Sequence, residues 1–206
     1  MNILVLGATG RVGSEVVRYA LNDGLQVTVF VRSPEKLQVE NDDLTVIQGN
    51  VLDKDAVVQA LKGIDVVISA LNFDGGMTLS TSMPYIVDAM EKEGVKRIIT
   101  VATAGILQSR VEPEKLRYQS SESKRTVTLP VEDHHAAYDY LSKSALDWTV
   151  VCPTYLPDGE RTGVYRVEKD FLPEDGNRIT VGDTADFTYK QITSNEYIKT
   201  RVGLAY

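Results

Sequence analysis

The sequence predicts an α/β fold built on one parallel sheet that is covered by helices on both faces. Over the first half of the chain, short apolar runs rich in β-branched residues alternate with segments of helical periodicity. These runs are nearly continuous, which is typical of strands buried on both faces of a parallel sheet. The first run, Ile3 to Leu6, leads directly into the glycine-rich turn Gly7-Ala8-Thr9-Gly10-Arg11-Val12-Gly13 and then into a helical segment. Together these features predict a Rossmann-type, doubly wound sheet with strand order 3-2-1-4-5-6 and a ligand crevice at the carboxyl ends of the strands.

Each element follows from its local pattern. Apolar runs predict strands at residues 3–6, 27–31, 44–47, 66–68, 97–101 and 148–152. Helical spacing predicts helices at residues 14–21, 56–61, 83–90 and 132–144, and a last helix from Gly182 to about Ile192 with Asp183 as its N-cap.

We expect residues 1–206 to form a single domain, with two loop regions on the substrate side. Residues 106–130 are polar and charged, with a short helix expected at 114–118; this segment is either a binding lid or a solvated, disordered connection. Residues 154–181 form a small C-terminal appendage of loops and short strands in this interpretation.

Composition excludes several classes of function. The net charge is −7 and no long basic run is present, so a nucleic-acid surface is not expected. No apolar run approaches the roughly 20 residues of a membrane helix, and the start of the chain lacks the pattern of a signal peptide. A single cysteine, Cys152, allows no internal disulfide. We therefore expect a cytoplasmic protein without a membrane partner; a homodimer or a regulatory protein partner stays open.

The glycine turn predicts a phosphate-binding loop. Gly7, Gly10 and Gly13 stand in phase between a strand and a helix. A tight turn that approaches a pyrophosphate closely requires glycine, and the N–H groups at the start of a helix favour negative charge. We expect this loop to bind a nicotinamide dinucleotide; the alternative is a structural turn without a ligand.

The end of the second strand bears on which dinucleotide is bound. NAD-binding domains usually place an acidic residue about 20 residues beyond the glycines, to hold the ribose 2′-hydroxyl. Here Arg32 follows the strand and no acidic residue precedes Glu35. A guanidinium can bind a 2′-phosphate in a bidentate geometry, with Lys36 as a second charge. The sequence thus favours NADP(H), with NAD(H) as second choice; Arg32 could instead stack on the adenine or remain solvated.

Several motifs in order resemble one family over nearly the whole chain. The family is the atypical short-chain dehydrogenase/reductases, and within it the NmrA-like, NAD(P)H-binding branch, which includes biliverdin-IXβ/flavin reductase-like proteins and NADH-flavin reductases. Its marks here are Gly7 to Gly13, Val31-Arg32-Ser33, Gly49-Asn50-Val51-Leu52-Asp53, Gly94-Val95-Lys96-Arg97, Leu146 to Pro153, Leu156-Pro157-Asp158-Gly159 and Asp183 to Phe187.

The resemblance implies a role for particular residues along a bound dinucleotide. The pyrophosphate would be lined by Thr9, Gly10, Arg11 and Val12, and the 2′-phosphate by Arg32, Ser33 and Lys36. The adenine would be bordered by Asn50 and Val51, and the ribose would lie over Ala70 and Leu71. The nicotinamide would lie near Thr103, Pro153, Thr154 and Tyr155. The chain departs from the family at Asn50, where aspartate is frequent, and at Cys152, where arginine is frequent.

Other polar residues do not form a recognisable catalytic set. A Tyr-x-x-x-Lys pair occurs only at Tyr165 and Lys169, in a β-like stretch, and we interpret it as chance. His134 and His135 are neighbours on a helix, so their side chains diverge and no metal site is expected. Thr103 is the candidate catalytic residue, as an orienting group and not an essential proton donor.

The sequence therefore favours an NADP(H)-binding oxidoreductase that reduces a small, flat, conjugated acceptor such as a flavin or quinone. Two alternatives stay open: an NmrA-like regulator that senses NADP without turnover, and an epimerase-like enzyme that uses NAD(P).

Overall fold

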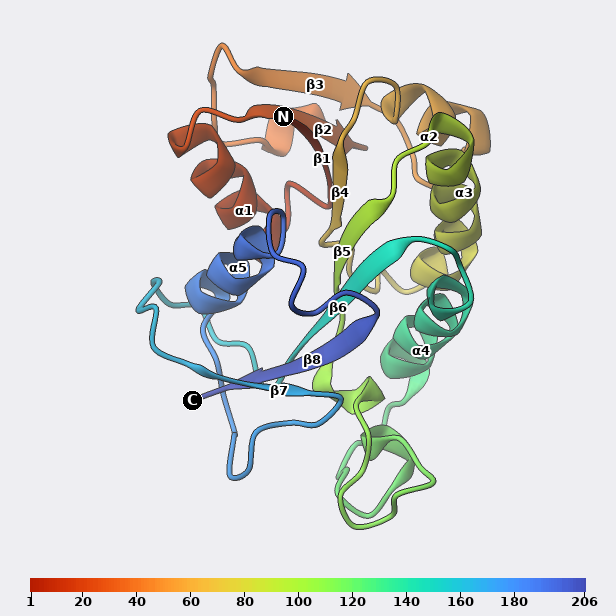
Figure 1. Cartoon of the computed structure of the whole chain (residues 1–206), viewed down its shortest axis with the longest axis vertical. Coiled ribbons are helices and arrows are strands. Elements are labelled where there is room, and N and C mark those ends of the chain that lie inside the picture. Colours follow the sequence, from red (N-terminus) through yellow and green to blue (C-terminus); the bar gives the residue numbers. More distant parts are fainter.

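A computed structural model describes all residues from Met1 to Tyr206, which form an eight-stranded sheet with helices on both faces (Figure 1). The strand order is β3-β2-β1-β4-β5-β6-β8-β7, so the predicted order of the first six strands is confirmed. These six strands are parallel; they are β1 (Asn2–Leu6), β2 (Gln26–Val31), β3 (Leu44–Gln48), β4 (Val66–Ser69), β5 (Arg97–Val101) and β6 (Asp147–Pro153).

Two further strands extend the sheet beyond β6. Strand β8 (Thr200–Ala205) pairs with β6 in parallel, and β7 (Arg166–Lys169) pairs with β8 antiparallel at the edge. The sequence analysis placed no strand at β8. The appendage expected at residues 154–181 is thus partly an extension of the sheet, because β7 belongs to it.

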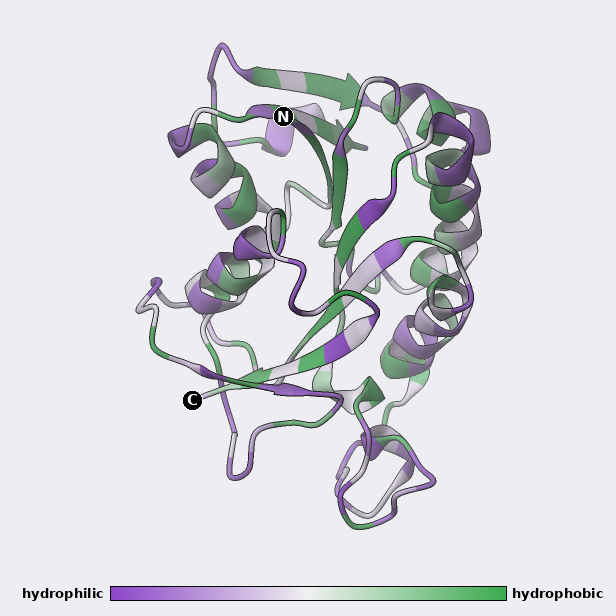
Figure 2. Ribbon diagram, viewed as in Figure 1, coloured by the Kyte–Doolittle hydropathy of each residue, from purple (hydrophilic) through white to green (hydrophobic).

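Helices cover both faces, and the two cores lie beneath them. Figure 1 shows α1 (Arg11–Asn22) and α5 (Val181–Lys190) on one side of the sheet, and α2 (Lys54–Ala60), α3 (Thr78–Glu93) and α4 (Leu129–Ser142) on the other. The strands between them are predominantly hydrophobic (Figure 2). Side chains that alternate along β1 serve opposite cores: Ile3 and Val5 face α1, while Leu4 and Leu6 join the α2–α4 side.

All five helices begin earlier than expected, by one to five residues, and the starts of α5 and α3 also show how each helix is capped. Helix α5 begins at Val181 and is capped by Thr180, whose hydroxyl accepts a hydrogen bond from the Asp183 N–H (3.2 Å); the prediction of Asp183 as N-cap is wrong. Helix α3 begins at Thr78, five residues before the expected start, and no residue of its own sequence caps it. The fully buried Asp133 on α4 does so instead, since its carboxylate accepts from the N–H groups of Leu79 (3.1 Å) and Ser80 (2.9 Å).

The segment between β5 and α4 folds on itself at one end of the molecule (Figure 1). It contains two short 3₁₀ turns, Ala104–Ile106 and Arg117–Gln119, the second lying close to the expected helix at 114–118. Backbone bonds join Ser109 to Lys115 (3.0 Å) and Arg117 to Leu107 (2.8 Å). No helix in the structure is long and apolar enough to cross a membrane.

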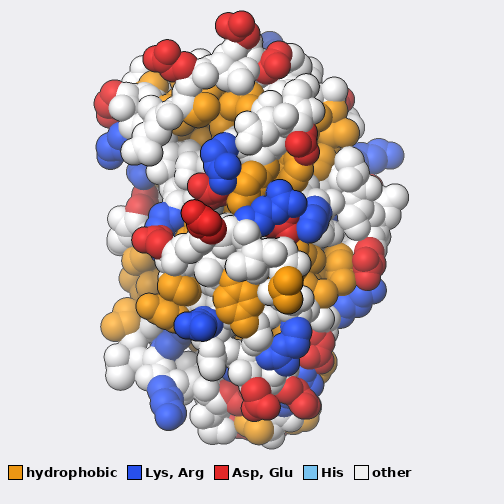
Figure 3. All heavy atoms as spheres, turned by 90° about the vertical axis from the view of Figure 1, so that its left-hand side faces the viewer, with side chains coloured by type: hydrophobic (Ala, Val, Ile, Leu, Met, Phe, Trp, Pro, Cys, Tyr) orange, Lys and Arg blue, Asp and Glu red, His pale blue; other side chains and the backbone are white.

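The face toward α1 and α5 carries basic and acidic side chains interspersed with apolar ones (Figure 3).

Candidate functional site

The glycine turn has the geometry that its motif predicts. Gly7 has a φ of +78°, and a Cβ there would lie 2.4 Å from the carbonyl oxygen of Ala70 at the end of β4. A Cβ on Gly13 would lie 2.2 Å from the Gly7 carbonyl oxygen, so this glycine lets α1 pack on the turn. Gly10 is the N-cap of α1 and no side chain caps the helix, which leaves N–H groups of its first turn available to an anion.

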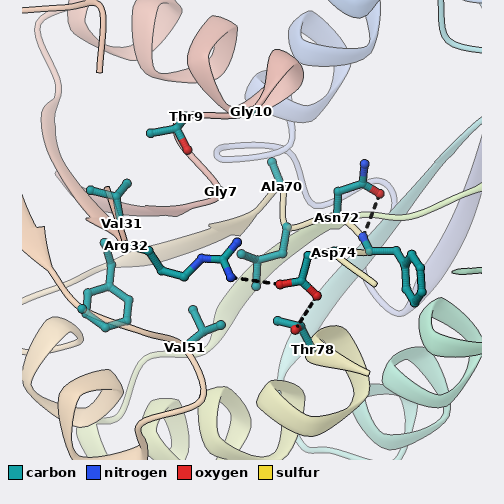
Figure 4. A pocket seen from close by; sticks show the side chains of 14 residues that line it. Gly7, Thr9, Gly10, Val31, Arg32, Val51, Ala70, Asn72, Asp74 and Thr78 are labelled. Atoms are coloured by element: carbon teal, nitrogen blue, oxygen red, sulfur yellow. Dashed lines mark hydrogen bonds and ion pairs between the residues drawn. The ribbon is translucent and has the colours of Figure 1, made fainter. Parts of the chain in front are cut away.

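A cavity of about 220 Å³ opens beside this turn, at the carboxyl ends of β1, β2 and β4. Figure 4 shows the loop residues Thr9 and Gly10 on one side and Val51 and Thr78 on the other. Fourteen residues line it: Gly7, Thr9, Gly10, Phe30, Val31, Arg32, Gly49, Val51, Ala70, Leu71, Asn72, Phe73, Asp74 and Thr78. The structure thus brings together seven residues named from the sequence, namely Gly7, Thr9, Gly10, Arg32, Val51, Ala70 and Leu71.

The seven other lining residues were missed by sequence reasoning. Phe30, Val31 and Gly49 adjoin predicted residues at strand ends, and Val31 and Gly49 belong to the motifs that mark the family, which is the signal that could have indicated them. Asn72, Phe73 and Asp74 follow the strand end at Ala70 and Leu71, so the same rule could have been carried three residues further.

An ion pair spans this cavity. The Arg32 guanidinium lies 3.0 Å from the Asp74 carboxylate, whose other oxygen accepts a hydrogen bond from the Thr78 hydroxyl at 2.8 Å (Figure 4). The hydrogen bond from Thr78, with further ones from Gly76 and Arg32, lowers the pKa of Asp74, so the carboxylate is charged at neutral pH. Any anionic group that binds Arg32 must therefore share it with Asp74.

Several residues predicted to contact the dinucleotide do not line this cavity. Lys36 lines an adjoining depression with Arg11 and Ser14, which shares Thr9 and Gly10 with the cavity, and Ser33 lines neither. The Asn50 side chain accepts a hydrogen bond from the Leu52 N–H (3.0 Å) in the turn that leads to α2. Arg11 donates to the Leu156 carbonyl (3.0 Å) and pairs with Asp158 (2.9 Å), and so fastens the loop after β6 to the phosphate loop.

Two predicted residues are structural neighbours of the cavity and do not line it. Val12 and Gly13 lie in the first turn of α1, and both are buried beneath the loop.

A second, larger cavity of about 620 Å³ lies at the carboxyl ends of β5 and β6. The predicted residues Thr103, Thr154 and Tyr155 line it, while Pro153 is buried at the end of β6. The Thr103 hydroxyl accepts a hydrogen bond from the Gly105 N–H (3.3 Å), and an Arg125 nitrogen lies 3.5 Å away. The remaining walls come mostly from the two predicted substrate-side loops, with Ala104 and Gly105 just before the first. The first loop contributes Arg117, Tyr118, Glu122, Ser123, Lys124 and Arg125, and the second contributes Asn177.

The histidines take different positions. His134 lies under the sheet end beside Leu71 and Ala102, and its burial lowers its pKa to about 4, so it is neutral at pH 7. His135 forms a hydrogen bond through Nδ1 with the hydroxyl of Tyr118 (3.0 Å), a residue that lines the second cavity.

The remaining candidates are structural. The Tyr165 hydroxyl donates to the buried Asp186 carboxylate (2.8 Å), and burial together with this bond raises the pKa of Tyr165. Neither Tyr165 nor Lys169 lines either cavity, so the two residues do not form a catalytic pair there. Cys152 is fully buried, which raises the pKa of its thiol to about 12 and keeps it neutral.

Comparison with known proteins gives consistent matches over the whole chain. A family profile described as NAD(P)H-binding matches residues 7–195. A candidate epimerase from Bacteroides thetaiotaomicron has a TM-score of 0.88 at 33% identity, with 100% of this chain and 96% of that one covered. A candidate NADH-flavin reductase from Streptococcus pneumoniae has a TM-score of 0.82 at 25% identity, with 100% and 99% covered.

A phenylcoumaran benzylic ether reductase from Ginkgo biloba is 26% identical over 207 residues, which correspond to 92% of this chain and 64% of the reductase. The chain spans between 46% and 64% of the length of this and three further plant and Streptomyces relatives.

Proposed function

This chain belongs to the NAD(P)H-binding family, the NmrA-like branch of the atypical short-chain dehydrogenase/reductases, and we propose that it is a reductase. In this proposal it transfers a hydride from NADPH to a flat, conjugated acceptor such as a flavin or quinone. The observation that supports this best is the pairing of two cavities along one sheet edge. The glycine loop after β1 borders the first cavity together with Ala70 after β4, and Thr103 after β5 borders the second. Strand β4 pairs with both β1 and β5, so the two cavities adjoin neighbouring strand ends.

The first cavity fits the dinucleotide on three counts. Glycine at position 7 lets the turn pack against the backbone of Ala70, which keeps the loop tight, and the uncapped start of α1 offers N–H groups to the pyrophosphate. Apolar side chains of Val51 and Leu71 suit an adenine ring. Arg32 provides the charge for a 2′-phosphate, which is the basis for proposing NADPH over NADH.

The protein's part in the reaction is binding and orientation. When bound, the dinucleotide supplies the hydride. Thr103, at the end of β5, offers a hydroxyl that can donate one hydrogen bond to the acceptor or the nicotinamide amide. No lysine contacts this hydroxyl, so it lacks the group that would make it acidic, and we assign it an orienting role.

The decisive experiment is NADPH oxidation, followed at 340 nm, with a panel of flavins and quinones. We expect acceptor-dependent oxidation. A Gly10→Asp variant should abolish it while retaining its fold by circular dichroism, because a Cβ at Gly10 would meet nothing closer than 3.2 Å and the carboxylate would repel the pyrophosphate at the start of α1. If NADPH binds but no acceptor accelerates its oxidation over the protein-free rate, the proposal fails and the regulatory alternative, binding without turnover, replaces it. Conversion of a nucleotide sugar without net NADPH oxidation would instead support the epimerase alternative.

A further inference from the structure

The second cavity has an unbalanced charge. Three cations line it, Arg117, Lys124 and Arg125, against one carboxylate, Glu122. Glu122 pairs with Arg117 at 3.4 Å and also accepts a hydrogen bond from the Arg110 N–H at 2.9 Å. Lys124 and Arg125 form no ion pair in the structure, although acidic residues outnumber basic ones in the chain and the net charge is −7. Two neighbouring cations therefore remain without a carboxylate partner beside the cavity.

Lys124 and Arg125 lie beside the cavity proposed for the acceptor and do not line the cavity proposed for the dinucleotide. An Arg125 nitrogen lies 3.5 Å from the Thr103 hydroxyl, so the guanidinium reaches over the end of β5. The phosphate-binding features of the first cavity, the start of α1 and Arg32, belong to other elements, and neither cation lines that cavity. The opposite wall, with Thr154, Tyr155 and Asn177, carries no charge that could neutralise them.

From this arrangement we propose that Arg125 and Lys124 bind an anionic group, a phosphate or a carboxylate, on the acceptor. The proposal rests on the proposed reductase function and specifies its substrate class. A cavity of about 620 Å³ lies within the range of roughly 300–1,000 Å³ found for sites of small ligands. It can hold a fused ring near Thr103 and an anionic substituent beside the loop that carries Lys124 and Arg125. A guanidinium binds either anion through two parallel hydrogen bonds, and the lysine adds a second charge.

The test compares acceptors that differ only in the anion. FMN and riboflavin share one ring system, and 1,4-naphthoquinone and its 2-carboxylate form the second pair. Dissociation constants are measured at low salt on protein saturated with NADP⁺, so that the dinucleotide cavity is blocked and no turnover is needed. We expect FMN to bind at least about tenfold more tightly than riboflavin, as for one charge-assisted hydrogen-bonded pair, and the preference to shrink with added salt.

Arg125→Ala should remove most of this preference while leaving riboflavin binding nearly unchanged. Lys115→Ala is the matched control, because Lys115 lies in the same loop but pairs with Glu112 and does not line the cavity. If FMN binds more tightly than riboflavin but the two naphthoquinones bind equally, the site is selective for a phosphate. If the anionic member of both pairs binds more tightly, the site accepts either a phosphate or a carboxylate. Equal affinities in both pairs, or an Arg125→Ala variant that weakens FMN and riboflavin alike, overturn the proposal. Because binding is measured without turnover, a failed oxidation assay would contradict the reductase function separately.

Discussion

Replacement of Arg32 tests the proposal that the first cavity prefers NADPH to NADH. The guanidinium is the cation in that cavity, and its side chain is 62% exposed. A charged hydrogen bond contributes about 1.5–3 kcal/mol. Solvent exposure and competition from Asp74 at 3.0 Å place Arg32 at the lower end of that range, near 1.5 kcal/mol, or about tenfold in Kd. Arg32→Ala should therefore weaken NADPH about tenfold and NADH hardly at all.

Asp74→Asn provides the opposite perturbation. It retains an oxygen to accept from Thr78 but removes the negative charge that competes for Arg32, so NADPH affinity should rise severalfold while NADH affinity stays the same. Isothermal titration calorimetry of the unmodified protein and both variants with each dinucleotide measures the six dissociation constants. Equal affinity of the unmodified protein for NADPH and NADH, or an equal loss of both in Arg32→Ala, would refute the reasoning.

Three further predictions concern the loop, the acceptor side and the response to pH. Gly13→Ala should destabilise the fold by about 3 kcal/mol in urea denaturation, because its Cβ would lie 2.2 Å from a backbone oxygen; Gly76→Ala, whose Cβ meets nothing closer than 3.7 Å, is the control, and equal stability of the two variants would contradict the steric argument. Thr103→Val should lower kcat at most about tenfold, with Thr103→Ser near the parent value; a loss of a thousandfold would indicate proton transfer through this hydroxyl. The pKa of His134 is about 4 in the folded protein against 6.5 ordinarily, so the unfolded state binds the proton first as pH falls. Stability should then drop by about 2 kcal/mol between pH 7 and pH 5, at 1.36 kcal/mol for each pH unit below 6.5. His134→Gln should lose most of that dependence, and an unchanged slope would show that another group is responsible.

The parts of the fold that could be predicted are those with a strong local signal. The buried parallel strands are β-branched runs such as Val27 to Val31, and the glycine turn fixes the first strand and helix. Strand β8 could not be found in the same way. Arg201 and Gly203 interrupt its apolar pattern, and its pairing depends on β6 and β7, which lie far from it in the sequence. Position 203 is glycine because a Cβ there would lie 2.1 Å from the Phe171 carbonyl oxygen.

The start of α5 shows how local rules can compete. Thr180 and Asp183 are three residues apart, and both residue types are good N-caps. The structure selects Thr180, and the Asp183 carboxylate instead accepts hydrogen bonds from the Thr162 N–H (2.8 Å) and the Tyr206 hydroxyl (2.6 Å). Those partners lie 21 and 23 residues away, so no local pattern could have indicated them.

For the candidate site, residues at strand ends could be predicted and residues on long loops could not. Gly7, Val51, Ala70 and Thr103 lie within three residues of a strand end, so the topology alone places them at one edge of the sheet. The partner of Arg32 lies 42 residues further along the chain, and Arg125 reaches Thr103 only because the segment between β5 and α4 folds back. Both contacts depend on loop conformation, for which the sequence carries no periodic signal.

The central claim is that one dinucleotide lies along the sheet edge from the glycine loop to Thr103. Hydrogen–deuterium exchange of the backbone amides, with and without saturating NADPH, tests it most directly. The account predicts slower exchange on binding at residues 7–13, 31–33, 70–74 and 103–105. Unchanged exchange at residues 7–13, or protection confined to parts of the chain away from both cavities, would contradict it.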